Sequence, residues 1–102
     1  MNRRIQLDDL LRDLIGPNVH LYFQPPEDLK LEYDCVVYTL VNKHATHADN
    51  KTYRKLDQYS ITVITENPDS TLPDKFFNVP MCRFDRTFKS GNMNHFVFTL
   101  FF

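Results

Sequence analysis

Residues 93–102 have the sequence MNHFVFTLFF, and this phenylalanine-rich stretch decides the fold that we expect of the chain. Because successive side chains of a β-strand point to opposite faces, one face here carries Phe96, Phe98, Leu100 and Phe102. The opposite face carries His95, Val97, Thr99 and Phe101 and is also largely apolar. A strand with one face in water alternates more cleanly than this. We therefore expect this strand to be covered on both faces.

In so small a chain, the second cover is expected to come from another subunit. The sequence also stops on Phe101-Phe102, although chain ends normally fray into water. Both features favour assembly over catalysis. The residues predicted to meet a neighbouring subunit are Val97, Thr99, Phe101 and Phe102.

The segments before this strand predict more of the same sheet. Residues 81–88 form a strand pattern with Cys82, Phe84 and Phe88 on one face, and residues 89–92 (KSGN) turn the chain into the last strand. Residues 34–42 are continuously apolar and aromatic, and residues 53–65 alternate well in their second half. The polar segment 43–52 between them is predicted to be a loop, so the two strands make a long hairpin. The first half of the second strand is too polar for a core and is expected to project beyond the domain.

Two helices are predicted. Residues 5–15 repeat leucine at helical spacing, and Gly16-Pro17 is a stop signal with glycine available for a left-handed conformation. The leucines expected to pack on the sheet are Leu7, Leu10, Leu11 and Leu14. Residues 20–23 form a short strand halted by Pro25-Pro26. A second, short helix begins with Thr71 as its N-cap and Asp74 at the capping-box position, and ends before Pro80.

The resulting order is helix, strand, strand, strand, helix, strand, strand. This order is typical of an α+β domain with a mixed or mainly antiparallel sheet of four to five strands. With 102 residues, the chain is expected to be one domain.

Composition narrows the function classes. The formal net charge is −1, which does not favour nucleic acid or membrane as the main partner. No apolar run approaches the roughly 20 residues of a membrane span, and no signal-peptide core is present. Cys35 and Cys82 lack metal-ligand spacing and lie in apolar strand patterns, so both are expected to be reduced and buried.

Few residues are arranged for chemistry. The chain has only two glycines, Gly16 and Gly91, and neither belongs to a phosphate-binding cluster. Cys82 and His95 lie on neighbouring predicted strands, yet core residues flank both, so we interpret them as packing residues rather than a catalytic pair. His44, His47 and Asp49 have a spacing that a metal site can use, but a solvated loop is the favoured interpretation. The sequence predicts no cofactor and no catalytic residue.

The tip of the long hairpin is locally basic. We expect six of its residues to contact a partner or a lumen: Lys43, His44, His47, Lys51, Arg54 and Lys55. The simpler interpretation of these charges is a solubilised hairpin that resists edge pairing. The alternative is contact with a polyanion, such as DNA in a lumen.

An ordered series of short segments resembles a family of small proteins from tailed bacteriophages and prophages of Firmicutes. These proteins are described as tail terminator, tail completion or minor tail proteins. The likeness covers residues 10–102 and rests on YFQPP (22–26), DCVVY (34–38), ADNKTY (48–53), YSITVI (59–64), NPDS (67–70) and NHFVFTL (94–100).

The resemblance implies an α+β subunit of a hexameric ring that caps the finished tail tube and faces the neck of the head. The implied partners are further copies of the chain, the tail tube protein and a head-completion or neck protein, with DNA passing through the lumen. The implied location is the virion, at the head–tail junction, after assembly in the host cytoplasm. No enzymatic activity is implied. A head-closure or tail tube subunit is the closest alternative, and a small metal-dependent hydrolase is a more distant one.

Overall fold

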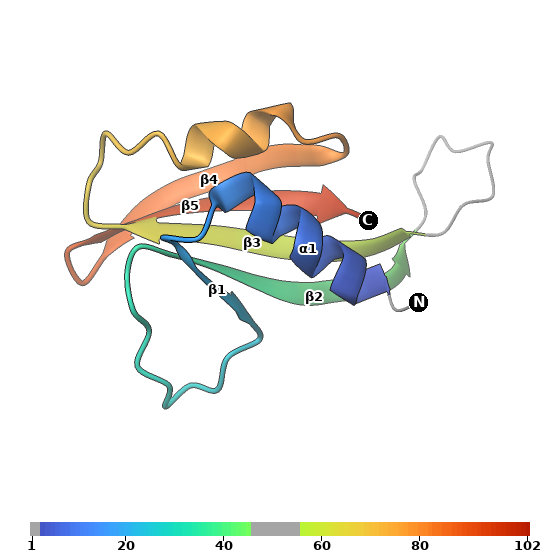
Figure 1. Ribbon diagram of the computed structural model, residues 1–102, viewed down its shortest axis with the longest axis horizontal. Helices are drawn as coiled ribbons and strands as arrows, with labels where there is room; N and C mark the ends of the chain where they lie inside the picture. The colour runs from blue at the N-terminus through green and yellow to red at the C-terminus, as the bar shows by residue number, and fades with distance from the viewer. Residues whose placement is uncertain (1–2, 46–55) are drawn as a thin grey trace.

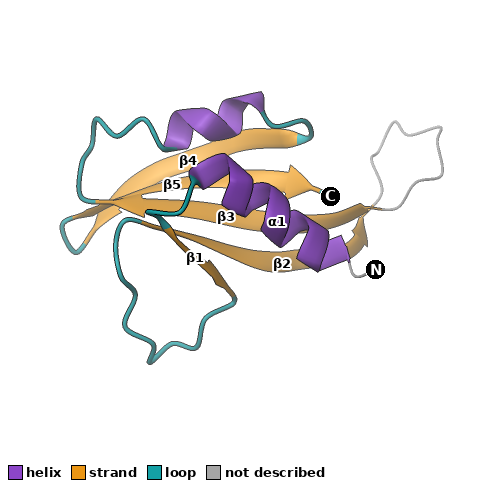
Figure 2. Ribbon diagram, in the orientation of Figure 1, coloured by secondary structure: helices purple, strands orange, loops and turns teal. Residues whose placement is uncertain are grey.

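The computed structural model describes residues 3–45 and 56–102 as a five-stranded sheet with helices on one face (Figures 1 and 2). An N-terminal helix and a short 3₁₀ helix accompany the sheet. In chain order the elements are α1 (Arg3–Ile15), β1 (His20–Phe23), β2 (Cys35–Ala45), β3 (Leu56–Thr65), η1 (Pro73–Asn78), β4 (Cys82–Ser90) and β5 (Met93–Phe101). The predicted α+β class is confirmed.

The strands lie in the order β1-β2-β3-β5-β4. β1 pairs with β2 in parallel, and the three other pairs are antiparallel, so the sheet is mixed. The phenylalanine-rich strand β5 is an interior strand between β3 and β4. The short β1 and the nine-residue β4 form the two edges.

The core lies between the helices and one face of the sheet. Apart from the helical residues and Leu72, it is built from alternate residues of the strands: Val36, Tyr38, Tyr59, Ile61, Val63, Phe98 and Leu100. Phe76 of η1 and Phe98 of β5 are both fully buried, with ring centroids 5.3 Å apart. The alternation predicted for the second half of residues 53–65, and the face predicted for Phe96, Phe98, Leu100 and Phe102, therefore assign the covered face correctly.

Helix α1 packs through Leu7, Leu11 and Ile15, which are all buried. The prediction that Leu10 packs on the sheet is wrong, since its side chain is 38% exposed. The helix is rotated so that Ile15, rather than Leu10, completes the buried stripe. The Tyr38 hydroxyl donates a 2.7 Å hydrogen bond to Asp8 and ties the helix to β2.

Glycine has the predicted role at the end of α1. Gly16 adopts φ +85°, and its N–H donates to the carbonyl of Arg12. The Arg12 guanidinium in turn donates to the carbonyls of Gly16 and Val19. The first turn after the helix is therefore held by Arg12.

Several predicted boundaries change. β2 continues to Ala45, so the predicted loop start at Lys43 is wrong, and β4 continues to Ser90 because Gly91 and Asn92 alone make the turn. Both turn residues have positive φ, as a two-residue hairpin turn requires. Thr71 does not cap η1: the helix begins after Leu72 and has no side-chain cap.

Candidate subunit interface

The face of the sheet opposite the helices carries no secondary structure among residues 3–45 and 56–102 (Figure 2). Register places three rows of residues side by side on this face. These rows are Thr39, Ser60, Thr99 and Arg83; Val37, Thr62, Val97 and Arg86; and Cys35, Ile64, His95 and Phe88. We call this surface the open face. Its first row is polar, and its other two rows are more apolar.

Part of the open face is shielded by its own side chains. Val97 is only 4% exposed, and the rings of Phe88 and His95 stack at 4.6 Å with an interplanar angle of 11°. Thr99 is half-buried. Of the residues predicted to meet a neighbour on this face, Thr99 therefore retains more accessible surface than Val97.

Phe101 and Phe102 lie at the end of β5 and are half-buried. They line an apolar pocket of about 230 Å³ together with Leu10, Leu56, Val79, Pro80, Met81 and Leu100. Leu10 and Met81 are exposed at this site. Phe102 packs against the core on the α1 side of the sheet, whereas Phe101 lines the pocket but shares its strand face with Val97 and Thr99.

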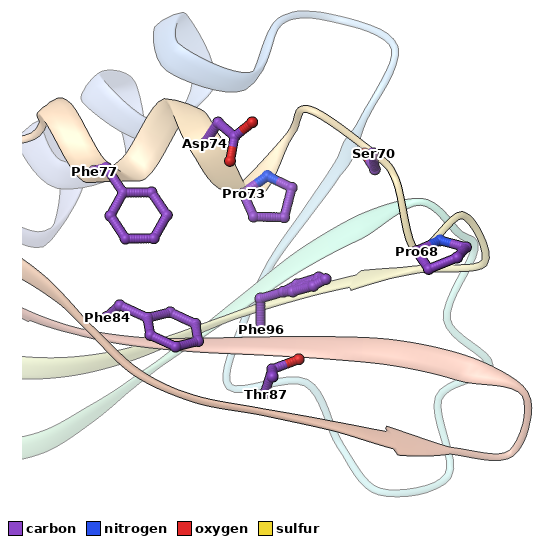
Figure 3. Close-up of a pocket in the computed structure, with 8 residues that line it drawn as sticks. All are labelled: Pro68, Ser70, Pro73, Asp74, Phe77, Phe84, Thr87 and Phe96. Carbon is purple, nitrogen blue, oxygen red and sulfur yellow. The ribbon is translucent and has the colours of Figure 1, made fainter.

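The edge strand β4 carries two exposed aromatic side chains, Phe84 and Phe88. Phe84 is 42% exposed and contacts Phe77 of η1, which is 57% exposed, at a centroid distance of 5.8 Å. Both rings also meet Phe98 edge-on. Between η1 and the sheet they form one wall of a pocket of about 260 Å³ (Figure 3). We call it the η1–β4 pocket; its lining residues are Pro68, Ser70, Pro73, Asp74, Phe77, Phe84, Thr87 and Phe96.

β4 is also basic. Arg83, Arg86 and Lys89 are exposed on this strand, against one acid, Asp85. Arg86 donates a 2.9 Å hydrogen bond to Asp85, while Arg83 and Lys89 form no ion pair within the part of the chain that the structure describes. The register shift between Phe84 and Arg86 leaves Asp85 as the extra residue of a β-bulge. The bulge turns Phe88 to the face opposite Cys82 and Phe84, so the prediction that these three residues share one face is wrong.

The opposite edge of the sheet is acidic. The loop of residues 24–34 joins β1 to β2 and hangs from the β1 edge (Figure 1). It carries four carboxylates, Glu27, Asp28, Glu32 and Asp34, and one lysine, Lys30. Leu29 and Tyr33 of the same loop are 43% and 47% exposed. The two edges of one sheet therefore have opposite charge, and both carry exposed apolar side chains.

The hairpin tip is only partly described. Lys43 is exposed and pairs with Asp57 at 3.5 Å, so Asp57 takes part in the sheet instead of projecting from it. The side chain of His44, and residues His47, Asp49, Lys51, Arg54 and Lys55, lie outside what the structure describes. The predicted partner contact and the alternative metal site at this tip both stay predictions.

The described residues show few of the features of catalysis. Burial raises the pKa of the Cys35 thiol, and that of Cys82, to about 11, so neither is a thiolate at neutral pH. Both cysteines are free; Cys35 is buried as predicted, but Cys82 is only half-buried. Cys82 is paired with Leu100 and His95 with Phe88, which places Cys82 and His95 at opposite ends of the β4–β5 ladder.

Within the described ranges, no group of three potential metal ligands comes together. No helix there has the length and apolar character needed to cross a membrane.

Sequence reasoning missed the η1–β4 pocket and the charge difference between the two edges. The signals were present as three cations in residues 83–89 and four carboxylates in residues 27–34. The strand order is needed to see that these charges lie at opposite edges of the sheet, because β1 and β4 are its two edge strands.

Comparison with known proteins gives no relative of this chain: no family model, no curated protein and no solved structure matches it.

Proposed function

We propose that the protein is a structural virion subunit that forms a ring, caps a phage tail tube and joins the tail to the head. The role within the virion rests on the sequence resemblance described above. The ring-forming part is supported by one structural observation above all: the open face carries β5 without covering helices, next to an edge strand with exposed aromatic rings.

The physical argument concerns apolar surface without a cover. Phe77 of η1 and Phe84 of β4 are both more than two-fifths exposed and lie together, while Phe88, also exposed on β4, lies on the open face. Exposed apolar surface that is gathered in one region is a mark of protein contact sites, whereas scattered single residues are ordinary. A long edge strand is also a template for pairing with another chain, and the bulge and cations of β4 restrict which chain is accepted.

The sheet presents different surfaces at its two edges, which favours a ring. A contact between two different patches repeats from copy to copy and closes into a ring when the rotation permits. A twofold dimer would instead pair one patch with itself. The basic β4 edge is poorly suited to meeting another β4 edge, because like charges would lie together.

Deletion of the coding sequence from an inducible phage genome tests the role in the virion. For a tail terminator, electron microscopy of the lysate should show filled heads and separate tails that lack a proper end, and purified protein added to the lysate should restore joining. Absence of all tails would identify a tube subunit, and tails of normal length beside leaking heads would identify a head-closure protein. Normal infectious particles would contradict a structural role.

The hydrolase alternative is tested by metal binding. A metal ion that binds only the folded state raises the melting temperature. Because we expect no zinc to bind, thermal melts with zinc and with chelator should superimpose. A rise of the melting temperature with zinc would support a metal site at the loop histidines His44 and His47.

A further inference from the structure

The outward side of α1 carries two carboxylates that the fold of the subunit does not explain. Asp9 and Asp13 are exposed, and neither carboxylate forms a hydrogen bond or an ion pair within the part of the chain that the structure describes. They are four residues apart, so two negative charges are neighbours on the helix surface and repel each other. Asp13 also lies in the last turn, at the negative end of the helix dipole. Both placements lower the stability of the helix.

Two cations of the same helix are used within the subunit. The Arg12 guanidinium donates to two carbonyls that follow the helix, and the Arg4 guanidinium lies 4.8 Å from the centre of the Phe23 ring. Ile5, one turn before Asp9, is 46% exposed. We call Ile5, Asp9 and Asp13 the outer stripe of α1. Along the helix, this stripe presents one apolar side chain and then two carboxylates.

The β4 side of the open face offers the opposite charge. Arg83 lies opposite Thr99 of β5, and Arg86 lies opposite Val97, so both arginines belong to the open face. Both are exposed. Arg83 forms no ion pair among the described residues, and Arg86 pairs with its neighbour Asp85. The open face therefore carries two guanidinium groups along one margin.

The spacings on the two surfaces match. Thr99 and Val97 are two residues apart on one strand, which separates the partners of these residues, the two arginines, by about 7 Å. Asp9 and Asp13 are separated by about 6 Å along the axis of the helix. A helix that lies along β4 can therefore place one carboxylate on each guanidinium.

The apolar residues occupy corresponding positions. The N–H of Phe101 donates to the carbonyl of Met81, which is 46% exposed. Met81 comes two residues before Arg83, as Ile5 comes one turn before Asp9. We call Met81, Arg83 and Arg86 the β4 margin of the open face. Like the outer stripe of α1, it presents one apolar side chain and then two charges.

The directions of the two surfaces agree with a ring. Within a subunit α1 runs opposite to β5 (Figure 1), and β4 is antiparallel to β5, so α1 and β4 run the same way. Neighbours in a hexameric ring are related by a rotation smaller than a right angle. The α1 helix of the next copy therefore keeps roughly the direction of β4, and the two series of side chains meet in the same order.

We propose that the outer stripe of α1 in one copy packs on the β4 margin of the open face in the next copy. Asp9 faces Arg83, and Asp13 faces Arg86. The open face thereby gains a helical cover, which its own subunit supplies to the opposite face. The contact joins two different patches, so it propagates from copy to copy in one direction. The inference rests on the proposed ring and deepens it by naming the surfaces that meet.

Each set of charges also has a simpler explanation. Exposed acids keep a protein soluble, and cations on an edge strand prevent aggregation. In addition, the 24–34 loop is a second acidic surface of the chain. None of these explanations requires α1 and β4 to have opposite signs. Reversing the charges on either surface therefore separates them from the proposed contact.

The test uses charge-reversed variants of the full chain. Asp9→Arg/Asp13→Arg, the α1 variant, makes both surfaces basic, and Arg83→Glu/Arg86→Glu, the β4 variant, makes both acidic. Each variant should self-associate about tenfold more weakly than the wild type in low salt, because two exposed ion pairs become repulsive pairs.

Mixing the variants gives the decisive comparison. In a mixture of the α1 and β4 variants, reversed and native contacts alternate, so assembly should return to the wild-type level. The matched control is Glu27→Arg/Asp28→Arg on the exposed part of the 24–34 loop, which has the same net charge as the α1 variant. This loop variant should associate like the wild type and should not restore assembly of the β4 variant. Sedimentation velocity up to about 1 mM measures these mixtures.

Two single variants separate the contact from folding. Asp13→Asn removes a negative charge from the negative end of the helix dipole, so the dilute monomer should melt at a slightly higher temperature. Its self-association should nevertheless weaken by up to about fivefold, because one ion pair is lost. Ile5→Gln, at an exposed site, should weaken assembly without lowering the melting temperature.

Each result decides something different. If the α1 and β4 variants assemble like the wild type, or if their mixture restores nothing, this docking mode is wrong while the ring proposal stands. Rescue of the β4 variant by the loop variant would assign the effect to the loop or to net charge and would also contradict this docking mode. If the wild type stays monomeric up to about 1 mM, the ring proposal and the docking mode are both wrong.

Discussion

The two faces of the sheet are made by the same strands but have different properties. On the covered face, Ile61 and Phe98 have no exposed surface, while on the open face their sequence neighbours Ser60 and Thr99 are half-buried and polar. The first face stabilises the fold because the helices pack on it. On the second face, Cys35, Ile64 and Val97 are buried as well, while Ser60 and Thr99 keep accessible surface that is available for contacts. One strand can thus carry the information for the fold and for a partner on alternate residues.

The largest expected effect follows from breaking the covered face. Phe98→Ala removes a fully buried ring that contacts Phe76, Phe77 and Phe84, and should lower the free energy of unfolding by about 3–5 kcal/mol. Urea denaturation followed by circular dichroism measures it. Phe84→Ala, in the same cluster but 42% exposed, is the control and should cost less. Equal losses in the two variants would contradict the assignment of the core.

The orientation of α1 predicts different losses of stability at two neighbouring leucines. Leu11→Ala should cost about 2–5 kcal/mol because Leu11 is fully buried. Leu10→Ala, one residue earlier, removes a side chain that is 38% exposed and should cost less than about 1 kcal/mol. Thermal and urea unfolding of the two variants measure this. If the order of the two effects were reversed, the helix would face the sheet differently.

Loss of the hydrogen bond between α1 and β2 should have an intermediate effect on stability. Tyr38→Phe removes the hydroxyl that donates to Asp8 at 2.7 Å and should cost about 1–3 kcal/mol, since the acceptor is a carboxylate. Equilibrium unfolding at neutral pH measures it, with Tyr33→Phe, whose ring is 47% exposed, as control. An unchanged stability would show that water replaces the lost bond.

The same tyrosine predicts a pH dependence. Burial, followed by the hydrogen bond to Asp8, raises the pKa of Tyr38 to about 12 from a value of 10.0, and burial raises the pKa of Cys35 and Cys82 to about 11 from 9.0. Folded-state pKa values above the unfolded ones mean that the unfolded chain loses its protons first. Stability from these groups is therefore complete below pH 9 and is lost as the pH rises to 12.

Unfolding at a series of pH values from 8 to 12 tests this expectation. The free energy of unfolding of Tyr38→Phe should fall less steeply than that of the wild type between pH 10 and 12, because the variant lacks one of the three groups. Identical slopes would contradict the assignment to Tyr38.

The smallest effect on folding is expected on the open face. Thr99→Glu places a carboxylate opposite Arg83 across the β4–β5 pair and should change the free energy of unfolding by no more than about 0.5 kcal/mol. If the open face meets a neighbour, the same change should weaken self-association in sedimentation experiments. Unchanged association would show that Thr99 is not at a contact, and loss of folding would contradict the small effect expected on stability.

The sequence predicted the elements and the covered face well, because both depend on local periodicity. Gly16, Gly91 and the alternation of Tyr59, Ile61 and Val63 are local signals, and the structure bears them out. Leu10 was misplaced because the leucines cover a wider stripe of the helix than the surface that packs on the sheet. The sequence alone does not show which of these leucines faces outward. Thr71 was misplaced because the short helix is 3₁₀ and begins after Leu72.

The candidate interface was harder to predict. Residues 27–34 and 83–89 are separated by about half the chain, and strand order alone shows that they occupy opposite edges. Likewise, the hydrophobic pattern of β5 predicted that another subunit covers its second face, but not that side chains such as Arg86 and Thr62 stand beside Val97 there. Such shielding depends on cross-strand register, which a single strand's sequence does not contain.

The mass and shape of the wild-type protein at high concentration test the central claim most directly. Sedimentation velocity at about 1 mM, with negative-stain electron microscopy of the same sample, should show one closed ring of defined subunit number in equilibrium with monomer. A protein that stays monomeric, or that stops at a twofold dimer, would contradict the claim that this chain is a ring-forming subunit.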